Sequence, residues 1–142
     1  MTYQPSRFLR RSSVAVCAVV WLAAATATHV PAETFSEVPV GDVVLHFTGY
    51  FGLTYVFLLT LRVHGVGFLH RVLLAAGVLL LYGALDEITQ PWVNRCASIY
   101  DWFANAVGIS AAVSLDALGS LVQWCWENAK NASKTMKSSP NT

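Results

Sequence analysis

The stretch VVLHFTGYFGLTYVFLLTL, residues 43–61, contains no Asp, Glu, Lys or Arg. A helix needs roughly 17–25 predominantly apolar residues to cross a hydrocarbon core about 30 Å thick, and this stretch meets that requirement. Three segments of similar character surround it, at residues 13–28, 72–88 and 102–122. We therefore predict an all-α membrane protein that folds as a compact bundle of four transmembrane helices.

The composition of the 142-residue chain supports this class. Hydrophobic residues make up 55% of the chain and charged residues 12%, whereas about 25% of a typical soluble domain is charged. The alternating segments of a membrane β-barrel are absent, so helices are the expected way to satisfy the backbone in lipid. The three cysteines lack the spacing of a metal site, and nothing in the sequence indicates nucleic-acid binding.

Basic residues lie at alternate ends of the four segments: Arg7, Arg10, Arg11, Arg62, Arg71, Lys130, Lys134 and Lys137. The other two connections carry Glu33 and Glu37 in one case and only Arg95 in the other. Because cytoplasmic loops carry an excess of Lys and Arg, both termini and the loop at residues 62–71 are predicted to be cytoplasmic. The expected location is the inner (cytoplasmic) membrane, as a multi-pass protein.

The chain divides into a basic cytoplasmic segment, a transmembrane domain and a polar, disordered cytoplasmic tail: residues 1–12, 13–126 and 127–142. The first apolar segment has a second interpretation, because a basic start, a short apolar stretch and Ala25-Thr26-Ala27 also resemble a cleavable secretory signal peptide. Apolar character continues through Val30, so we favour an uncleaved span.

Polar residues inside the second segment follow one helix face. Asp42, His46 and Tyr50 are spaced i, i+4 and i+8, which places them one above another on an α-helix. At 1.5 Å per residue, the row reaches roughly 12 Å into the membrane from its outer boundary.

Two other segments carry polar residues at the same predicted depth. The third ends in Asp86, Glu87 and Gln90, and the fourth begins near Asp101 and continues to Asn105. Ionisable residues inside a membrane usually face the bundle interior or a water-filled cavity. We therefore expect these residues and the row on the second segment to converge on a pocket that opens outward. Such a pocket suits a polar ligand with amines, hydroxyls or a phosphate, although a self-satisfied polar network fits the same pattern.

The acidic residues also have structural interpretations. Asp42 lies at a helix start, where a carboxylate can cap the helix. Ser98 and Asp101 have the spacing of a capping box. Glu87 and Arg95 are expected to form an ion pair that fixes the connection between the third and fourth segments.

His46 has three interpretations. It can form an interhelical hydrogen bond, worth roughly 1 kcal/mol, or act as a general base or acid oriented by a carboxylate. No partner nucleophile can be identified. A metal site with Asp42, Glu87 or Asp101 lacks the usual dense His/Cys spacing, so we predict neither a metal nor another cofactor. Asp116, near the cytoplasmic end of the fourth segment, is expected to reach the membrane interface.

The same polar residues carry a family resemblance. The segments DVVLHFTGYFGLTYVFLL, residues 42–59, and YGALDEITQPWVNRCASIYDWFANAVG, residues 82–108, resemble the VanZ-like family of small bacterial membrane proteins. That family has an Asp, a His and a Tyr on one span, a Glu and a Gln ending the next, then an Arg, and an Asp and Asn-x-x-Gly starting the last. The matching residues are Asp42, His46, Tyr50, Glu87, Gln90, Arg95, Asp101, Asn105 and Gly108. Val43 departs from the pattern, which often has a basic residue there.

The resemblance implies a role in the cell envelope and no settled activity. The founding member is associated with low-level resistance to the glycopeptide teicoplanin, and resistance is a special case that does not carry over by resemblance alone. Besides the lipid bilayer, the first hypothesis expects a lipid-linked precursor, a headgroup or a glycopeptide, bound at the outer face. Its ligand-binding residues are Asp42, His46, Tyr50, Glu87, Gln90, Arg95, Asp101 and Asn105.

Two further hypotheses stay open. One is a membrane enzyme in which His46 and a carboxylate transfer a proton on an envelope lipid. The other is an accessory or assembly subunit whose polar cluster is structural. The sequence does not decide whether the protein is an enzyme, and it indicates no particular protein partner.

Overall fold

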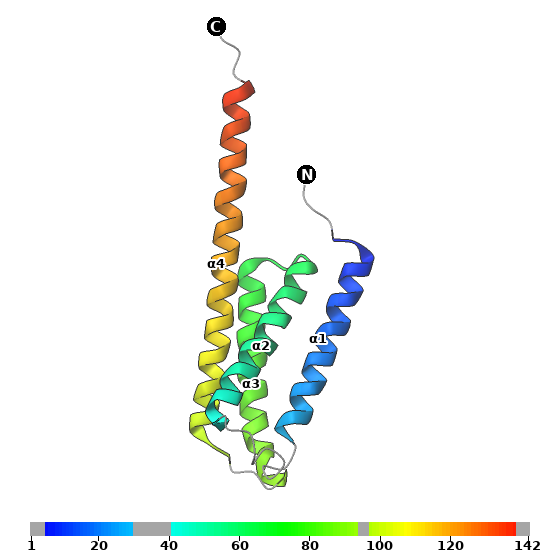
Figure 1. Ribbon diagram of the computed structural model, residues 1–142, viewed down its shortest axis with the longest axis vertical. Helices are drawn as coiled ribbons and strands as arrows, with labels where there is room; N and C mark the ends of the chain where they lie inside the picture. The colour runs from blue at the N-terminus through cyan, green and yellow to red at the C-terminus, as the bar shows by residue number, and fades with distance from the viewer. Residues whose placement is uncertain (1–4, 30–40, 94–96, 139–142) are drawn as a thin grey trace.

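The computed structural model describes residues 5–29, 41–93 and 97–138. It contains four long helices and one short 3₁₀ turn: α1 (Arg7–Thr28), α2 (Asp42–Val63), α3 (Phe68–Thr89), η2 (Gln90–Val93) and α4 (Ile99–Ser138). Each long helix is sufficiently long and apolar to cross a membrane. The predicted all-α bundle of four transmembrane helices is therefore confirmed (Figure 1).

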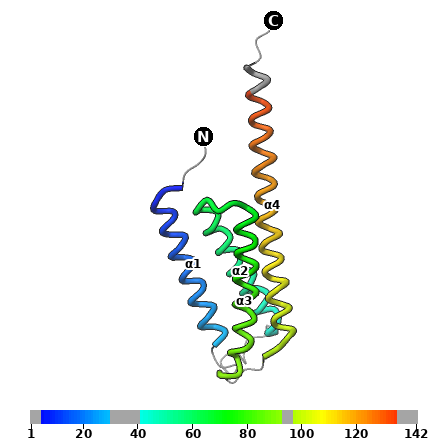
Figure 2. The backbone as a smooth tube through the Cα atoms, turned by 180° about the vertical axis from the view of Figure 1, so that it is seen from behind, coloured from blue at the N-terminus to red at the C-terminus, as the bar shows by residue number. Residues whose placement is uncertain are grey.

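The helices run alternately up and down through the bundle, as the two opposite views show (Figures 1 and 2). At one end lie the start of α1 and the connection between α2 and α3, at residues 64–67. At the other end lie the starts of α2 and α4 and the end of α3. This second end brings together the polar residues of three helices that are distant in sequence, and we call it the His46 end.

Helices α2 and α4 approach each other closely at Gly108. A Cβ atom at this position would clash with the carbonyl oxygen of Phe47 and would lie 3.0 Å from the backbone nitrogen of Phe51. Ala104 and Ala112, one turn on either side of Gly108, are 7% and 0% exposed. Small residues at every fourth position allow the backbones of membrane helices to touch. This contact holds the first turns of α4 against the first turns of α2.

The bundle core is small and apolar. Leu53, Leu79 and Ile109 are buried together with Tyr50, and Leu58 packs in a second group nearer the opposite end. Many large apolar side chains on the outer faces are exposed, and in a membrane-spanning bundle these faces contact lipid.

Helix α1 packs at the edge of the bundle. Cys17 is its buried residue, and Trp21 contacts the rings of Phe57 and Tyr82 at centroid distances of 6.1 Å and 5.0 Å. The hydroxyl of Thr60 donates a hydrogen bond to the carbonyl oxygen of Ser13 at 3.3 Å. These contacts fix α1 against α2 and α3 while leaving most of its surface exposed.

Helix α4 extends well beyond the other helices (Figure 1). It contains 40 residues, which corresponds to about 60 Å at 1.5 Å per residue. The predicted disorder therefore does not hold for residues 127–138, which continue the helix. The tail contains Ala129, Lys130, Ala132 and Lys134, all good helix formers, and no Gly or Pro interrupts it before Pro140. Extending a formed helix avoids the cost of nucleation.

Candidate functional site

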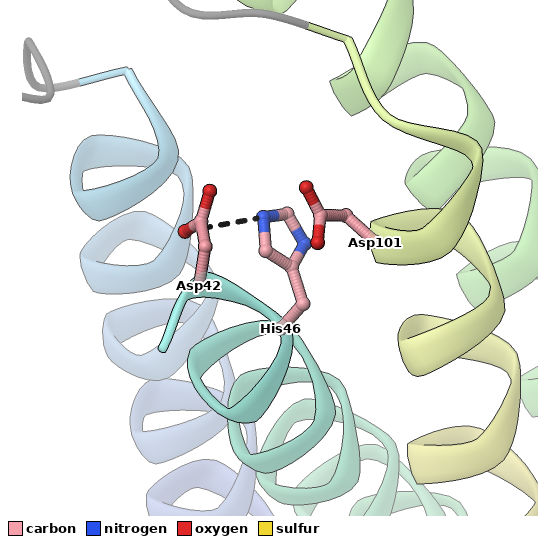
Figure 3. A group of neighbouring side chains, drawn as sticks. All are labelled: Asp42, His46 and Asp101. Atoms are coloured by element: carbon pink, nitrogen blue, oxygen red, sulfur yellow. Dashed lines mark ion pairs between the residues drawn. The ribbon is translucent and has the colours of Figure 1, made fainter. Parts of the chain in front are cut away.

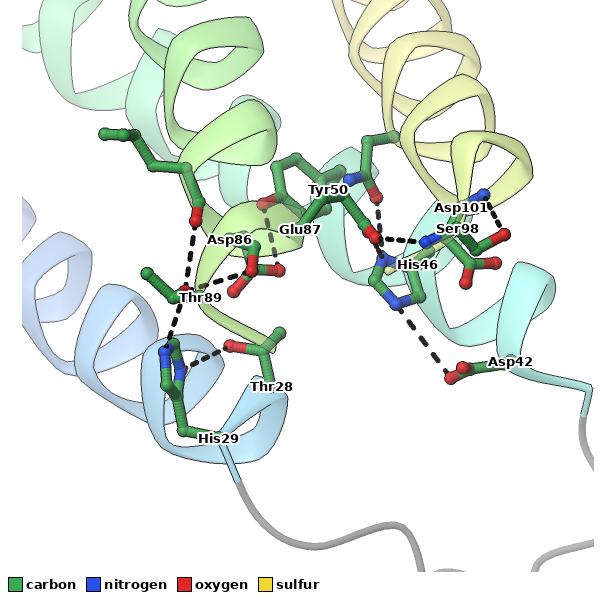
Figure 4. Close-up of polar contacts among 12 residues, drawn as sticks. Thr28, His29, Asp42, His46, Tyr50, Asp86, Glu87, Thr89, Ser98 and Asp101 are labelled. Carbon is green, nitrogen blue, oxygen red and sulfur yellow. Dashed lines mark hydrogen bonds and ion pairs between the residues drawn. The ribbon is translucent and has the colours of Figure 1, made fainter. Parts of the chain in front are cut away.

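The centre of the His46 end is the imidazole of His46, which is 5% exposed. Its Nε2 atom lies 3.9 Å from Oδ1 of Asp42, one turn earlier on α2. Its ring stacks on that of Tyr50, one turn later, at a centroid distance of 6.5 Å. The structure therefore places these three side chains in the predicted row (Figure 4).

Asn105 on α4 contacts the other ring nitrogen of His46. The distance between His46 Nδ1 and Asn105 Oδ1 is 3.0 Å, and both side chains are buried. An amide carbonyl oxygen only accepts hydrogen bonds, so His46 Nδ1 is the donor and carries a proton. In the neutral imidazole, the lone pair then lies on Nε2, on the side of Asp42.

Glu87 links the end of α3 to the start of α4. Its Oε2 atom accepts a hydrogen bond of 2.9 Å from the backbone nitrogen of Ser98, and its Oε1 atom lies 3.7 Å from His46 Nδ1. Ser98 Oγ accepts from the backbone nitrogen of Asp101 at 3.4 Å, which is one half of the predicted capping box. The expected reciprocal bond from Asp101 to Ser98 is absent, because Glu87 binds that nitrogen instead.

Asp101 is 5% exposed and points toward His46 (Figure 3). Among the described residues, no hydrogen bond or ion pair reaches its carboxylate. Asp42 points toward the same ring from the opposite side (Figure 3), and its side chain is 51% exposed. The capping position before α2 is Gly41, so Asp42 is the first helical residue and not the predicted N-cap.

Asp86 belongs to this site, although the sequence interpretation left it outside the ligand-binding set. It is 2% exposed, and its Oδ2 atom accepts a hydrogen bond from the hydroxyl of Tyr50 at 3.4 Å. Consecutive residues on a helix point about 100° apart, so sequence alone favours only one of Asp86 and Glu87 facing a site. Helix α3 has neighbours on both sides at this end, and both acids are buried. The adjacent acids themselves were the available signal.

We call these residues the His46 cluster: Asp42, His46, Tyr50, Asp86, Glu87, Asp101 and Asn105. It carries four carboxylates. Within the described part of the chain, no ion pair joins Asp86, Glu87 or Asp101 to a Lys or Arg side chain.

Several buried polar atoms of this region have no hydrogen-bond partner within the described part of the chain. They are Asp86 Oδ1, Glu87 Oε1, Asn105 Nδ2 and both amide atoms of Gln90. Gln90 itself is 0% exposed. A buried polar group without a partner costs about 1–3 kcal/mol, and more when it is charged. These atoms are therefore available to a partner outside the described residues.

Gly83 provides space beside the cluster. A Cβ atom there would lie 3.2 Å from Asn105 Nδ2 and 3.2 Å from Tyr50 Cε1. Such contacts are tighter than ordinary packing, so a side chain at this position would push against two cluster residues.

The predicted partner of Glu87 cannot be placed. Arg95 lies outside the described residues, as do Glu33, Glu37 and Cys96. The Glu87–Arg95 ion pair therefore stays a prediction.

A second polar group lies near the opposite end of the bundle, and we call it the Asp116 cluster: Arg62, Arg71, Asp116 and Ser120. Asp116 is 3% exposed, so its carboxylate is held inside the bundle; its position at the depth of the membrane interface stays a prediction. Its Oδ1 and Oδ2 atoms each lie 2.8 Å from a guanidinium nitrogen, of Arg62 and Arg71 respectively. Both guanidinium groups also donate to Ser120 Oγ, at 2.6 Å and 2.7 Å. The sequence signal for this cluster was that Asp116 lies near the same end of its segment as Arg62 and Arg71 do of theirs.

Within the described residues, two groups of side chains have the spacing of metal ligands. They are Asp42, His46 and Asp101, and also His46, Asp86 and Glu87. In each group, one ligand atom from every residue lies within 4.8 Å of the others. The cluster can therefore hold a cation by geometry as well as by charge.

Comparison with known proteins provides no relative: no family model, no curated protein and no solved structure matches the chain. The chain is a small multi-pass protein whose four apolar helices contact the lipid bilayer. At one end of the bundle it buries a cluster of His, Asp and Glu side chains.

Proposed function

We propose that this chain is a VanZ-like protein of the bacterial inner membrane whose His46 cluster binds a polar envelope component at the outer face. One observation carries the proposal: three buried carboxylates, of Asp86, Glu87 and Asp101, lie around one imidazole with no described basic partner. Buried ionisable groups in membrane proteins are rare and usually functional. The family resemblance in the same residues supports this role.

The distribution of charge supports an outward-facing cluster. Arg62 and Arg71 lie at the end opposite the His46 end, and Arg10 and Arg11 lie in the first turns of α1 at that same opposite end. Because Lys and Arg are enriched on the cytoplasmic side of membrane proteins, this distribution supports an outer position for the His46 end.

The charge of the cluster favours a ligand with an amine. Four carboxylates around one imidazole attract an ammonium group, and the amide nitrogen of Asn105 can donate to a ligand oxygen. An aminophospholipid headgroup, a lipid-linked precursor and a glycopeptide all combine amines with oxygen acceptors. A link to teicoplanin resistance follows from the resemblance only.

A lipid-retention experiment tests the proposal. The protein is purified in detergent, exchanged into vesicles of aminophospholipid and phosphatidylglycerol, and its retained lipids are measured by native mass spectrometry. We expect the wild-type protein to retain the aminophospholipid selectively, and Glu87→Gln, His46→Gln and Asn105→Ala to lose that selectivity. Thr48→Ala, at an exposed position on the same helix, is the matched control.

Three other results would contradict the proposal. Equal retention by wild type and variants would exclude the cluster as the binding site. Loss of all three variants from the membrane would indicate that the cluster is structural, as in an accessory subunit. Chemical conversion of the lipid that disappears in His46→Gln would indicate an enzyme.

A further inference from the structure

We propose that His46 Nε2 and the carboxylates of Asp42 and Asp101 form a binding site for a divalent transition-metal ion. One ligand atom from each residue lies within 4.8 Å of the other two. His46 Nε2 and Asp42 Oδ1 are 3.9 Å apart, whereas two ligands of a tetrahedral zinc ion are about 3.3–3.5 Å apart. Zinc binding therefore requires the three ligand atoms to approach one another by side-chain rotation.

The hydrogen bond from His46 to Asn105 prepares the imidazole for a metal. A metal-binding histidine generally donates its other ring N–H to a carbonyl, a carboxylate or water, which fixes the tautomer and the ring orientation. Here Nδ1 lies 3.0 Å from Asn105 Oδ1. The remaining nitrogen, Nε2, faces Asp42 with its lone pair available.

Asp101 provides an independent observation that points to a cation. Asp101 is only 5% exposed, and its side chain points toward His46 (Figure 3). Its carboxylate has no described hydrogen-bond or ion-pair partner. Burying an isolated carboxylate is costly unless it is paired or coordinates a metal. Asp42, which is half-exposed, gives the site access to solution.

The second group of candidate ligands, His46 with Asp86 and Glu87, is more heavily occupied. Glu87 Oε2 accepts from the Ser98 backbone, and Asp86 Oδ2 accepts from Tyr50. The imidazole nitrogen nearest Glu87 is Nδ1, which already binds Asn105. Because the carboxylate of Asp101 has no described hydrogen-bond or ion-pair partner, these engaged atoms favour the group that contains Asp101.

The ligand set selects the class of metal. An imidazole nitrogen with two carboxylates suits Zn²⁺ or a similar first-row ion, whereas Mg²⁺ and Ca²⁺ prefer all-oxygen sites. Three protein ligands leave a coordination position open, as in catalytic zinc sites. This inference goes beyond the proposed lipid binding, and metal binding can be measured without any lipid.

The test is a zinc titration of the full chain in detergent. The protein is purified without a polyhistidine tag, stripped with a chelator, and titrated with Zn²⁺ by calorimetry. Cobalt absorption spectra report the coordination. We expect a single zinc ion per chain, resistant to excess Mg²⁺ or Ca²⁺.

Variants assign the ligands. His46→Gln and Asp101→Asn should abolish binding, and Asn105→Ala, which removes a positioning residue, should weaken it about 10–100-fold. Asp42→Asn, at a half-exposed position, gives a ligand variant that should fold even if Asp101→Asn does not. His64→Gln changes an exposed histidine at the opposite end and should bind like the wild type.

Two results would overturn the assignment. Binding that survives Asp42→Asn and Asp101→Asn but disappears in Glu87→Gln would place the ion in the second group. Binding that is unaffected by His46→Gln, or absent from a folded wild-type chain, would exclude a site at this residue.

Discussion

The two buried polar clusters of this bundle differ in how their charges are matched. In the Asp116 cluster, one carboxylate meets two guanidinium groups at 2.8 Å, and Ser120 accepts from both. In the His46 cluster, several carboxylates surround one imidazole, and buried oxygens of Asp86 and Glu87 have no described hydrogen-bond partner. The charges of the Asp116 cluster are therefore matched within the protein, as expected for a cluster that stabilises the fold. The charges of the His46 cluster are not matched by described residues, as expected for a binding site.

Both clusters depend on the same helix. Asp101 and Asn105 project from the first turns of α4, and Asp116 and Ser120 from a later part of it. Helix α4 therefore does not by itself explain why the charges are paired in one cluster and not in the other. They follow from which residues α2 and α3 provide at each end.

The largest expected effect tests whether the Asp116 cluster fixes the fold. Asp116→Ala leaves Arg71, which is 6% exposed, buried without its counter-ion. Breaking a buried pair in this way costs about 3–5 kcal/mol. We expect a loss of this size in the free energy of unfolding, measured in mixed detergent micelles. Glu127→Ala, an exposed acid further along α4, is the control. An equally small change in both variants would show that the two clusters do not differ as described.

The next effect tests how α4 is held against α2. Gly108→Ala introduces a methyl group against the Phe47 carbonyl and the Phe51 backbone, and overpacking of this kind costs about 1–3 kcal/mol. The displaced helix should also separate Asp101 from His46 and weaken zinc binding. Gly77→Ala on α3 meets no atom within 4 Å and should stabilise the helix by up to about 1 kcal/mol. Equal stability of the two alanine variants would show that the close contact is not required.

A smaller effect is expected when a charge is removed from the His46 cluster. Glu87→Gln keeps an oxygen that can accept from Ser98 and removes a negative charge near Asp86 and Asp101. The free energy of unfolding should change by less than about 1 kcal/mol, although lipid selectivity is lost. A destabilisation as large as that of Asp116→Ala would make the two clusters equivalent and contradict the comparison.

The smallest effect concerns the end of α4. Residues 121–134 are exposed along their whole length, and the contacts of Glu127 with Gln123 and of Lys130 with Trp126 lie within α4 itself. The unfolding free energy of the shortened chain should stay within about 0.5 kcal/mol of the wild type. A larger loss would show that the extension supports the Asp116 cluster.

The sequence predicts the four spans and the row from Asp42 to Tyr50 because both depend on local patterns. Hydropathy identifies a span within one segment, and a spacing of four residues identifies one helix face. Neither pattern specifies which faces of different helices meet. Three features depend on how the helices pack against one another. They are the burial of Asp116 between Arg62 and Arg71, the hydrogen bond from Ser98 to Glu87, and the inclusion of Asp86 in the site. They became visible only with the packed bundle.

The length of α4 between the clusters has a consequence for the host membrane. From Asp101 to Asp116, the two buried acids of α4, the helix rises about 22 Å, which is less than the roughly 30 Å of a bilayer's hydrocarbon core. Because α4 contributes residues to both clusters, it fixes the distance between them along the bundle. No ionisable residue of α4 lies between Asp101 and Asp116, so the middle of this span carries no charge from α4. Because the helix fixes the spacing, a bilayer of different thickness would change the depth of at least one cluster.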